Sequence, residues 1–312
     1  MLNGVHRIPT NAMTRDQWLA IRRESIGGSD AAAIAGLNEW ASPYSVWADK
    51  TGRVKDKPDN EAMRQGRDLE EYVARRWCET SGKKVKRVNA ILRCGDYPFA
   101  HANVDRWVVG ENAGLECKTT SVLRLKEFRG GHYPDTYYAQ CVHYMAVTGA
   151  DRWYLAVLVL GRDFCSFVIE RDQEEIDALM CMEKEFWKHI EQDTPPPVDG
   201  TGVTTDAIHA IYSHSDTKTV DLFGMESTFA LYQKAKEALR ESEMVVRKYE
   251  NAIKERLGKA ESGSVGRYTA TWKNQTRSSF DLKRFSEDHP EIDPAPYYNT
   301  NTFRRFTVKE MQ

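Results

Sequence analysis

The sequence has no Cys-x-x-C pair, because its six cysteines are scattered along the chain. It also lacks a long apolar run, since the longest, Tyr154 to Leu160, is far too short to cross a bilayer. The first residues do not contain the apolar core of a signal peptide. These absences argue against a zinc site, an iron–sulfur cluster, a disulfide framework and a membrane span. We therefore expect a protein of the reducing cytoplasm.

An excess of charge of one sign is lacking too. The 44 Lys and Arg residues balance 46 Asp and Glu residues, which gives a formal net charge of −2. A strongly basic domain is the usual mark of nucleic-acid binding, so composition does not indicate that function. A local basic channel remains compatible with this balance, because steering depends on how charge is distributed. The composition is that of a globular protein, and it leaves function open.

Helical and strand patterns alternate through residues 1–193. They predict an α/β (α+β) domain in which helices flank a central mixed sheet. Serine followed by proline at Ser42 and Pro43 is a typical helix start. The expected helices span residues 14–23, 29–35, 42–50, 60–80, 133–148 and 172–192. The expected strands span residues 90–93, 99–109, 114–120, 152–160 and 165–170.

A proline-rich stretch at 194–201 interrupts these patterns and is the expected linker. Residues 202–312 then form an expected C-terminal extension. Within it, residues 225–259 have apolar side chains near heptad spacing, which predicts a long helix in a hairpin arm or coiled coil. Short strands are expected at 267–273 and 303–308.

Two carboxylates and a lysine carry the chemistry that the sequence suggests. Asp105 lies in a strand-like run, and Glu116 and Lys118 lie in another, with a turn between the runs at 110–114. Residues two apart on a strand share a face, and an adjacent antiparallel strand could bring Asp105 to that face. Two oxygen ligands beside one ammonium group suit a Mg²⁺ or Mn²⁺ site that activates water against a phosphodiester.

This pattern has an ordinary alternative, namely a solvated strand face with a cross-strand ion pair. Its surroundings favour the metal site. Glu70 lies on the expected helix before the sheet, and Gln140 and Tyr144 lie one turn apart on the helix after it.

Five motifs occur in a fixed order between residues 14 and 160, and together they resemble one family. They are Trp18 to Arg22, Ile26 to Asp30, Gly66 to Glu70, Asp105 with Glu116 to Lys118, and Tyr137 with Gln140 and Tyr144. In this order the sequence resembles the YqaJ-type viral recombinases of the phage lambda exonuclease family. That family belongs to the PD-(D/E)xK nuclease superfamily, whose core is restriction-endonuclease-like. The residue before Asp105 is Val104, not the proline of the superfamily's name.

The resemblance implies roles for the acidic motif. Asp105 and Glu116 match metal ligands, and the backbone carbonyl of Cys117 would complete the inner shell. Glu70 would join the site at a second ion or through water. Lys118 would orient the attacking water and stabilise its hydroxide form.

The resemblance also implies roles for two other motifs. Gln140 would position water or a phosphate oxygen, and Tyr144 is a possible further member that could simply pack. Arg22 and Ser29 match a pocket for a terminal 5′-phosphate, and Arg23 would replace Arg22 if the register were shifted by one. An arginine fork binds phosphate bidentately, and a glycine-loosened helix start suits an anion.

The activity that the resemblance implies is Mg²⁺-dependent 5′→3′ digestion of one strand of linear double-stranded DNA, with two ions per site and Mn²⁺ as a substitute. The remaining 3′ tail would pass to a phage single-strand annealing protein for recombination. A homotrimeric ring, encoded by a phage or prophage and acting in a bacterial host, is implied as well. Two alternatives stay open: a DNA endonuclease with the same metal site, and a non-catalytic DNA-end binding protein.

Overall fold

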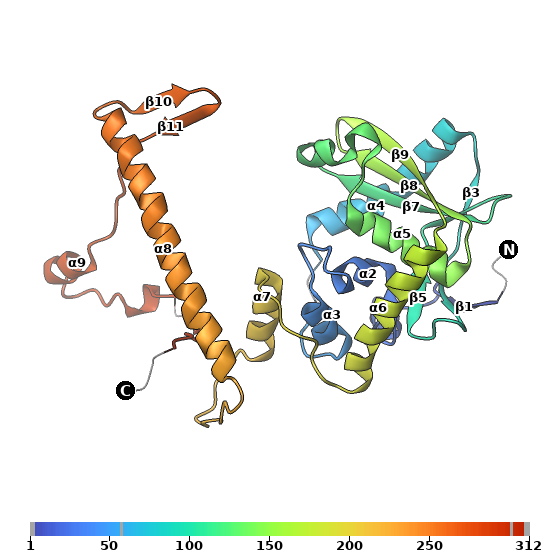
Figure 1. Ribbon diagram of the computed structural model, residues 1–312, viewed down its shortest axis with the longest axis horizontal. Helices are drawn as coiled ribbons and strands as arrows, with labels where there is room; N and C mark the ends of the chain where they lie inside the picture. The colour runs from blue at the N-terminus through green and yellow to red at the C-terminus, as the bar shows by residue number, and fades with distance from the viewer. Residues whose placement is uncertain (1–3, 57–58, 300–301, 309–312) are drawn as a thin grey trace. The chain divides into compact units, whose positions relative to one another are not determined.

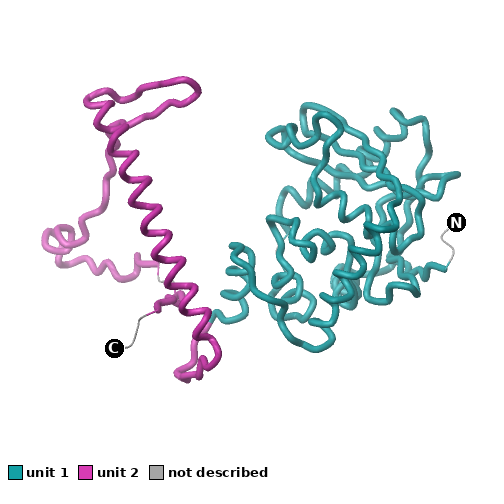
Figure 2. Tube along the Cα trace, viewed as in Figure 1, with its two compact units in different colours: residues 1–213 teal, residues 214–312 magenta. Residues whose placement is uncertain are grey.

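The computed structural model describes residues 4–56, 59–299 and 302–308. The chain forms two compact units, which divide after Ser213 (Figure 2). The proline-rich stretch at 194–201 contains no helix or strand, but the division does not fall there. The first unit therefore extends further than the 1–193 domain expected from the sequence.

The helix α7 (Gly202–Ile211) explains this difference. Its Thr204 is buried, and the Thr204 hydroxyl donates a 2.7 Å hydrogen bond to Oγ of Ser42, the N-cap of α3 (Pro43–Lys50). Ala207 is buried in the same interface and joins the main core. Residues 202–213 thus complete the first unit.

A five-stranded sheet forms the centre of the first unit (Figure 1). Strands β7 and β8 are parallel and the other neighbours are antiparallel, so the sheet is mixed as predicted. The helix α5 (Asp135–Thr148) connects the two parallel strands, as a crossover must. In spatial order the strands are β3 (Val85–Arg87), β6 (Arg106–Val108), β7 (Ala113–Thr120), β8 (Arg152–Val159) and β9 (Asp163–Glu170).

The unit contains a second sheet, whereas the sequence predicted one. Its strands are, in spatial order, β1 (Val5–Pro9), β4 (Ala90–Cys94), β5 (Ala100–Asn103) and β2 (Ile26–Gly27). The single strand expected at 99–109 is therefore wrong. The first part of this segment, β5, pairs with β4 in the second sheet. The chain then bends at Asp105, and the next part, β6, pairs with β7 in the five-stranded sheet. The change of partner sheet interrupts the strand at Asp105.

The helices of the first unit confirm the predicted ones, and Thr14, Ser42 and Asn60 cap three of them. Successive residues of β8 point to opposite faces of the sheet and so join two different apolar clusters. Tyr154 packs against Trp77 of α4, while Leu155 joins the cluster that contains Met145 of α5. Besides α3, α5 and α7 the unit has α1 (Arg15–Arg23), α2 (Gly28–Ile34), α4 (Glu61–Ser81), α6 (Gln173–Glu191) and the 3₁₀ segment η1 (Val122–Gly131).

The second unit is built on the long helix α8 (Glu226–Leu257), which agrees with the predicted helix at 225–259. None of the helix's described residues is buried. The strand expected at 303–308 is wrong: these residues pair with no strand in the described chain, and Phe306 instead contacts the ring of Tyr232 on α8. The unit also contains β10 (Ser262–Val265), β11 (Tyr268–Thr271), α9 (Leu282–Asp288) and η2 (Ala295–Tyr297). Across both units, no described helix combines the length and apolar content needed to cross a bilayer.

Candidate active site

The pairing of β6 with β7 brings Asp105 next to Glu116. Arg106 lies opposite Leu115 in this antiparallel pair. Asp105, one residue before Arg106, therefore lies opposite Glu116, one residue after Leu115. The Cys117 amide donates a 2.8 Å hydrogen bond to Oδ2 of Asp105. Lys118 Nζ lies 2.7 Å from Glu116 Oε1 on the same face of β7. The structure thus gathers the two carboxylates and the lysine that the sequence pattern singled out.

Gln140, on α5, completes this cluster from above the sheet. Its Oε1 accepts a 2.8 Å hydrogen bond from Lys118 Nζ, and its Nε2 donates to Glu116 Oε1 and to the Tyr144 hydroxyl, each at 2.8 Å. Tyr144 is itself buried and packs against Trp153. Because the Lys118 ammonium can only donate, the Gln140 side-chain atom that it contacts must be the amide oxygen. Tyr144 therefore holds Gln140 in place, and Gln140 holds Lys118.

Burial and repulsion disturb the charges of the cluster. Burial, then the negative charges of Glu116 and Glu70, raise the pKa of Asp105 well above its usual value. Burial alone would lower the pKa of Lys118, but its attraction to and hydrogen bond with Glu116 outweigh burial and raise that pKa. The lysine is thus a permanent cation beside two carboxylates that repel each other.

Glu116 shows where a cation would fit. Its Oε2 is buried and has no hydrogen-bond partner among the described residues, and such an oxygen is costly unless something compensates it. A divalent ion between Glu116 and Asp105 would satisfy this oxygen and relieve the repulsion. The residues present therefore fit Mg²⁺ or Mn²⁺, both of which prefer oxygen ligands.

Glu70 does not complete a three-carboxylate cluster. Across residues 4–56, 59–299 and 302–308, no three Asp, Glu, His or Cys side chains converge closely enough to hold a metal ion. Glu70 instead forms an ion pair with Arg106, because α4 packs on the face of β7 that carries Leu115 and Cys117, opposite to Glu116. The expected role of Glu70 at a second ion stays a prediction.

Arg106 is a site residue that the sequence reasoning missed. It is 3% exposed, pairs with Glu70 and Glu71, and donates a 2.7 Å hydrogen bond to the Asp105 carbonyl. An arginine directly after the metal-binding candidate, in an otherwise apolar run, was the available signal. A buried arginine must be paired, so it indicated nearby carboxylates.

Arg22 and Ser29 lie together, as the resemblance implied. Arg22 is at the end of α1 and Ser29 in the first turn of α2, and Arg22 Nη2 donates a 3.0 Å hydrogen bond to Ser29 Oγ. The guanidinium also lies 4.7 Å from the centre of the Trp18 ring. Arg23, the alternative, forms ion pairs with Asp49 and Asp56. Arg22 is therefore the arginine that reaches Ser29.

The start of α2 presses directly on α5. A Cβ atom added to Gly28 would lie 2.6 Å from Cε1 of Tyr144 and 3.1 Å from Cγ of Gln140. Only glycine permits so close an approach. The segment that carries Ser29 therefore contacts the residue that holds Lys118.

Asp30 and Lys50 form a buried pair that supports this segment, and the sequence indicated no role for either residue. Lys50 Nζ lies 2.7 Å from Asp30 Oδ2 and donates hydrogen bonds to the carbonyls of Arg22 and Ser25. Asp30 Oδ2 also accepts from the Gly27 amide at 2.9 Å. Burial opposes the charge of Asp30, but Lys50 and Arg22 lower its pKa to about 2. The pair ties α1, α2 and α3 together.

We expect Lys50→Met to destabilise the protein by about 3 kcal/mol, because it leaves the Asp30 carboxylate buried without its cation. The double variant with Asp30→Asn should recover part of this loss. Since the Asp30 pKa is lowered on folding, the pair stabilises the protein above the usual Asp pKa of 3.8, and that contribution is lost as the pH falls towards 2. Urea unfolding followed by tryptophan fluorescence measures both effects. A double variant no more stable than Lys50→Met would contradict the pairing.

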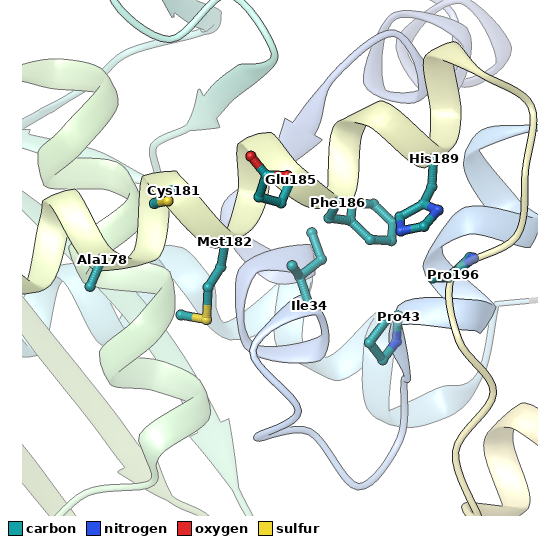
Figure 3. Close-up of a pocket in the computed structure, with 9 residues that line it drawn as sticks. All are labelled: Ile34, Pro43, Ala178, Cys181, Met182, Glu185, Phe186, His189 and Pro196. Atoms are coloured by element: carbon teal, nitrogen blue, oxygen red, sulfur yellow. The ribbon is translucent and has the colours of Figure 1, made fainter.

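The first unit has hollows on its surface, two of which border α2. One, of about 430 Å³, is lined by Ser29 and Gln140 and so connects the two clusters described above. The other, of about 470 Å³, lies between α6 and the α2–α3 region and is lined mainly by apolar side chains such as Met182 and Phe186 (Figure 3). It contains none of the carboxylates or the lysine of the acidic cluster.

The chain is similar to known proteins in sequence and in fold. Residues 17–151 match the family described as the YqaJ-like viral recombinase domain. Uncharacterized protein YqaJ of Bacillus subtilis (strain 168) is 39% identical over 305 residues, covering 96% of this chain and 95% of that protein. The alkaline exonuclease LHK-Exo from Laribacter hongkongensis has a similar fold, with a TM-score of 0.50 and 20% identity over 57% of this chain and 93% of its own. The chain belongs to the YqaJ-like viral recombinase family.

Proposed function

We propose that the protein is a metal-dependent deoxyribonuclease that digests one strand of linear double-stranded DNA from its 5′ end towards its 3′ end. The observation that carries this proposal is the buried, unpartnered Glu116 oxygen beside Asp105, with Lys118 held against Glu116 by Gln140. A non-catalytic DNA-binding protein would have no use for two buried acidic side chains that repel each other.

Each residue of the cluster has a role in the proposed reaction. Asp105, Glu116 and the Cys117 carbonyl would hold Mg²⁺ or Mn²⁺, which lowers the pKa of bound water and offsets negative charge on the phosphate. Lys118 donates a hydrogen bond to the attacking water and stabilises negative charge that develops there. Gln140 keeps the lysine ammonium turned towards this position. Glu70 would act at a second ion, for which its bond with Arg106 would have to open.

The wider setting is proposed from family membership and the fold. The first unit would be a PD-(D/E)xK core, supported by the mixed sheet between α4 and α5. The enzyme would act in the cytoplasm of a bacterial host as a homotrimeric ring, encoded by a phage or prophage. The 3′ tail that it leaves would be passed to a single-strand annealing protein.

The test is a linear duplex with one 5′-phosphorylated end and one blocked end, incubated with Mg²⁺ beside a closed circular control. We expect progressive loss of the phosphorylated strand, an untouched circle and no reaction in EDTA. Cleavage of the circle would identify an endonuclease with the same site. Absence of hydrolysis with both Mg²⁺ and Mn²⁺ would indicate a non-catalytic end-binding protein.

We expect Arg22→Gln to abolish the preference for 5′-phosphorylated over 5′-hydroxyl ends. Hydrogen bonds between charged groups contribute about 1.5 to 3 kcal/mol each, so the preference should fall by at least about tenfold. The initial digestion rates of the two substrates measure this ratio. Arg23→Gln is the matched control, because Arg23 is paired with Asp49 and Asp56. An unchanged ratio in Arg22→Gln would place the phosphate pocket elsewhere.

A further inference from the structure

The hollow of about 430 Å³ has the size of a small-ligand site, which is typically about 300 to 1,000 Å³. Ser29 lies on its wall and accepts a hydrogen bond from Arg22. Gln140 lies on its wall too and binds Lys118. A nucleotide with its 5′-phosphate at Ser29 would therefore extend towards the cluster that carries out hydrolysis.

Trp40 is the unusual member of this lining. It lies in the loop between α2 and α3 and is 70% exposed, although a tryptophan side chain normally buries much of its large apolar surface. The loop around it is ordered by local hydrogen bonds. The Leu37 amide donates to the Ala32 carbonyl, and the Trp40 amide donates to Oδ1 of Asn38, each at 2.8 Å. The exposed indole is thus presented on a fixed turn.

The charges around the hollow favour a base beside Trp40. Glu39, Asp135 and Arg124 also line the hollow. Arg124 is already paired with Glu127 through two 2.8 Å hydrogen bonds, so the carboxylates of Glu39 and Asp135 still disfavour a phosphate beside them. Arg22, behind Ser29, donates to a hydroxyl instead of a carboxylate and can therefore bind a phosphate there. A phosphate therefore fits at Ser29, and the uncharged, planar part of the nucleotide fits at the indole.

We propose that Trp40 stacks on the 5′-terminal base of the strand being digested, and so recognises a nucleotide drawn out of the duplex end. This inference rests on the proposed function for the identity of the ligand. Stacking on an aromatic side chain tolerates every base, because each base has a π-face. Such a contact would allow digestion through any sequence while still requiring a base at the end.

The test measures binding rather than cleavage, so it does not depend on hydrolysis. Two duplexes, alike except that the 5′-phosphorylated terminal nucleotide is normal in one and abasic in the other, are titrated by fluorescence anisotropy in EDTA. The unaltered protein should bind the normal end about tenfold more tightly, the scale of one stacking contact. Trp40→Leu should remove this difference, and Trp40→Phe should retain most of it.

Trp272→Leu, at an exposed tryptophan of the second unit, is the matched control and should leave the difference intact. If Trp40→Leu weakens the normal and abasic ends equally, Trp40 acts through loop shape or assembly, and the stacking proposal is overturned. The same holds if the unaltered protein does not distinguish the two ends. Digestion of linear DNA can succeed or fail separately, so the two proposals are tested independently.

Discussion

Lys118→Ala should reduce the rate of DNA hydrolysis by about a thousandfold or more, because it removes a cation that contacts both Glu116 and Gln140. The loss should appear in kcat, since the ammonium stabilises charge that develops during the reaction. Single-turnover digestion of a 5′-phosphorylated duplex measures it. DNA affinity in EDTA should change little.

Two controls separate this effect from damage to the fold. Lys184→Ala, at an exposed lysine of α6, should digest DNA at the normal rate. Lys118→Ala should also keep a cooperative thermal transition, although Glu116 loses a partner. Turnover within a fewfold of normal would remove Lys118 from the mechanism.

Asp105→Asn should abolish activity and metal binding together while leaving the metal-free protein as stable as before or more so. The asparagine has the same shape and can still accept the hydrogen bond from the Cys117 amide. It also removes a buried charge that Glu116 repels. A metal at a hundred times its Kd stabilises its protein by about 2.7 kcal/mol, and this gain should vanish in the variant.

Thermal unfolding with and without Mn²⁺, beside titration calorimetry, distinguishes this outcome from a general loss of stability. Asp206→Asn, at an exposed aspartate of α7, is the control and should retain the full metal-dependent shift in Tm. An Asp105→Asn protein that is still stabilised by Mn²⁺ would show that the ion binds elsewhere.

Much of the first unit could be predicted because its signals are local. The capping residues Ser42 and Asn60 mark helix starts. In β7 the side chains alternate between the two faces of the sheet, so Glu116 and Lys118 must share a face. The second sheet could not be predicted in this way. Its strands β1 and β4 come from distant parts of the chain, and β2 has only two residues, so their pairing depends on tertiary contacts.

The candidate site was predictable to the same extent. Asp105, Glu116, Lys118 and Gln140 follow from the spacing and the family resemblance taken together, whereas the buried ion pairs around them do not. Arg106 and Lys50 are buried charges whose function depends on which carboxylate faces them, and that is a property of packing. The strand expected at 303–308 failed for a related reason. Its aromatic and β-branched residues favour a strand, but the described chain provides no neighbouring strand to pair with it.

In the proposed reaction, the contact at Gly28 would set the length of the product released in each cycle. Since the backbone of α2 at Gly28 packs directly on the buried side chains of Tyr144 and Gln140, the spacing from Ser29 to Gln140 is set by a close contact between two helices. A terminal phosphate held at Ser29 would then place the same phosphodiester at the hydrolytic cluster in every cycle. The helix junction would act as a molecular ruler, and the enzyme would advance in equal steps whatever the DNA sequence.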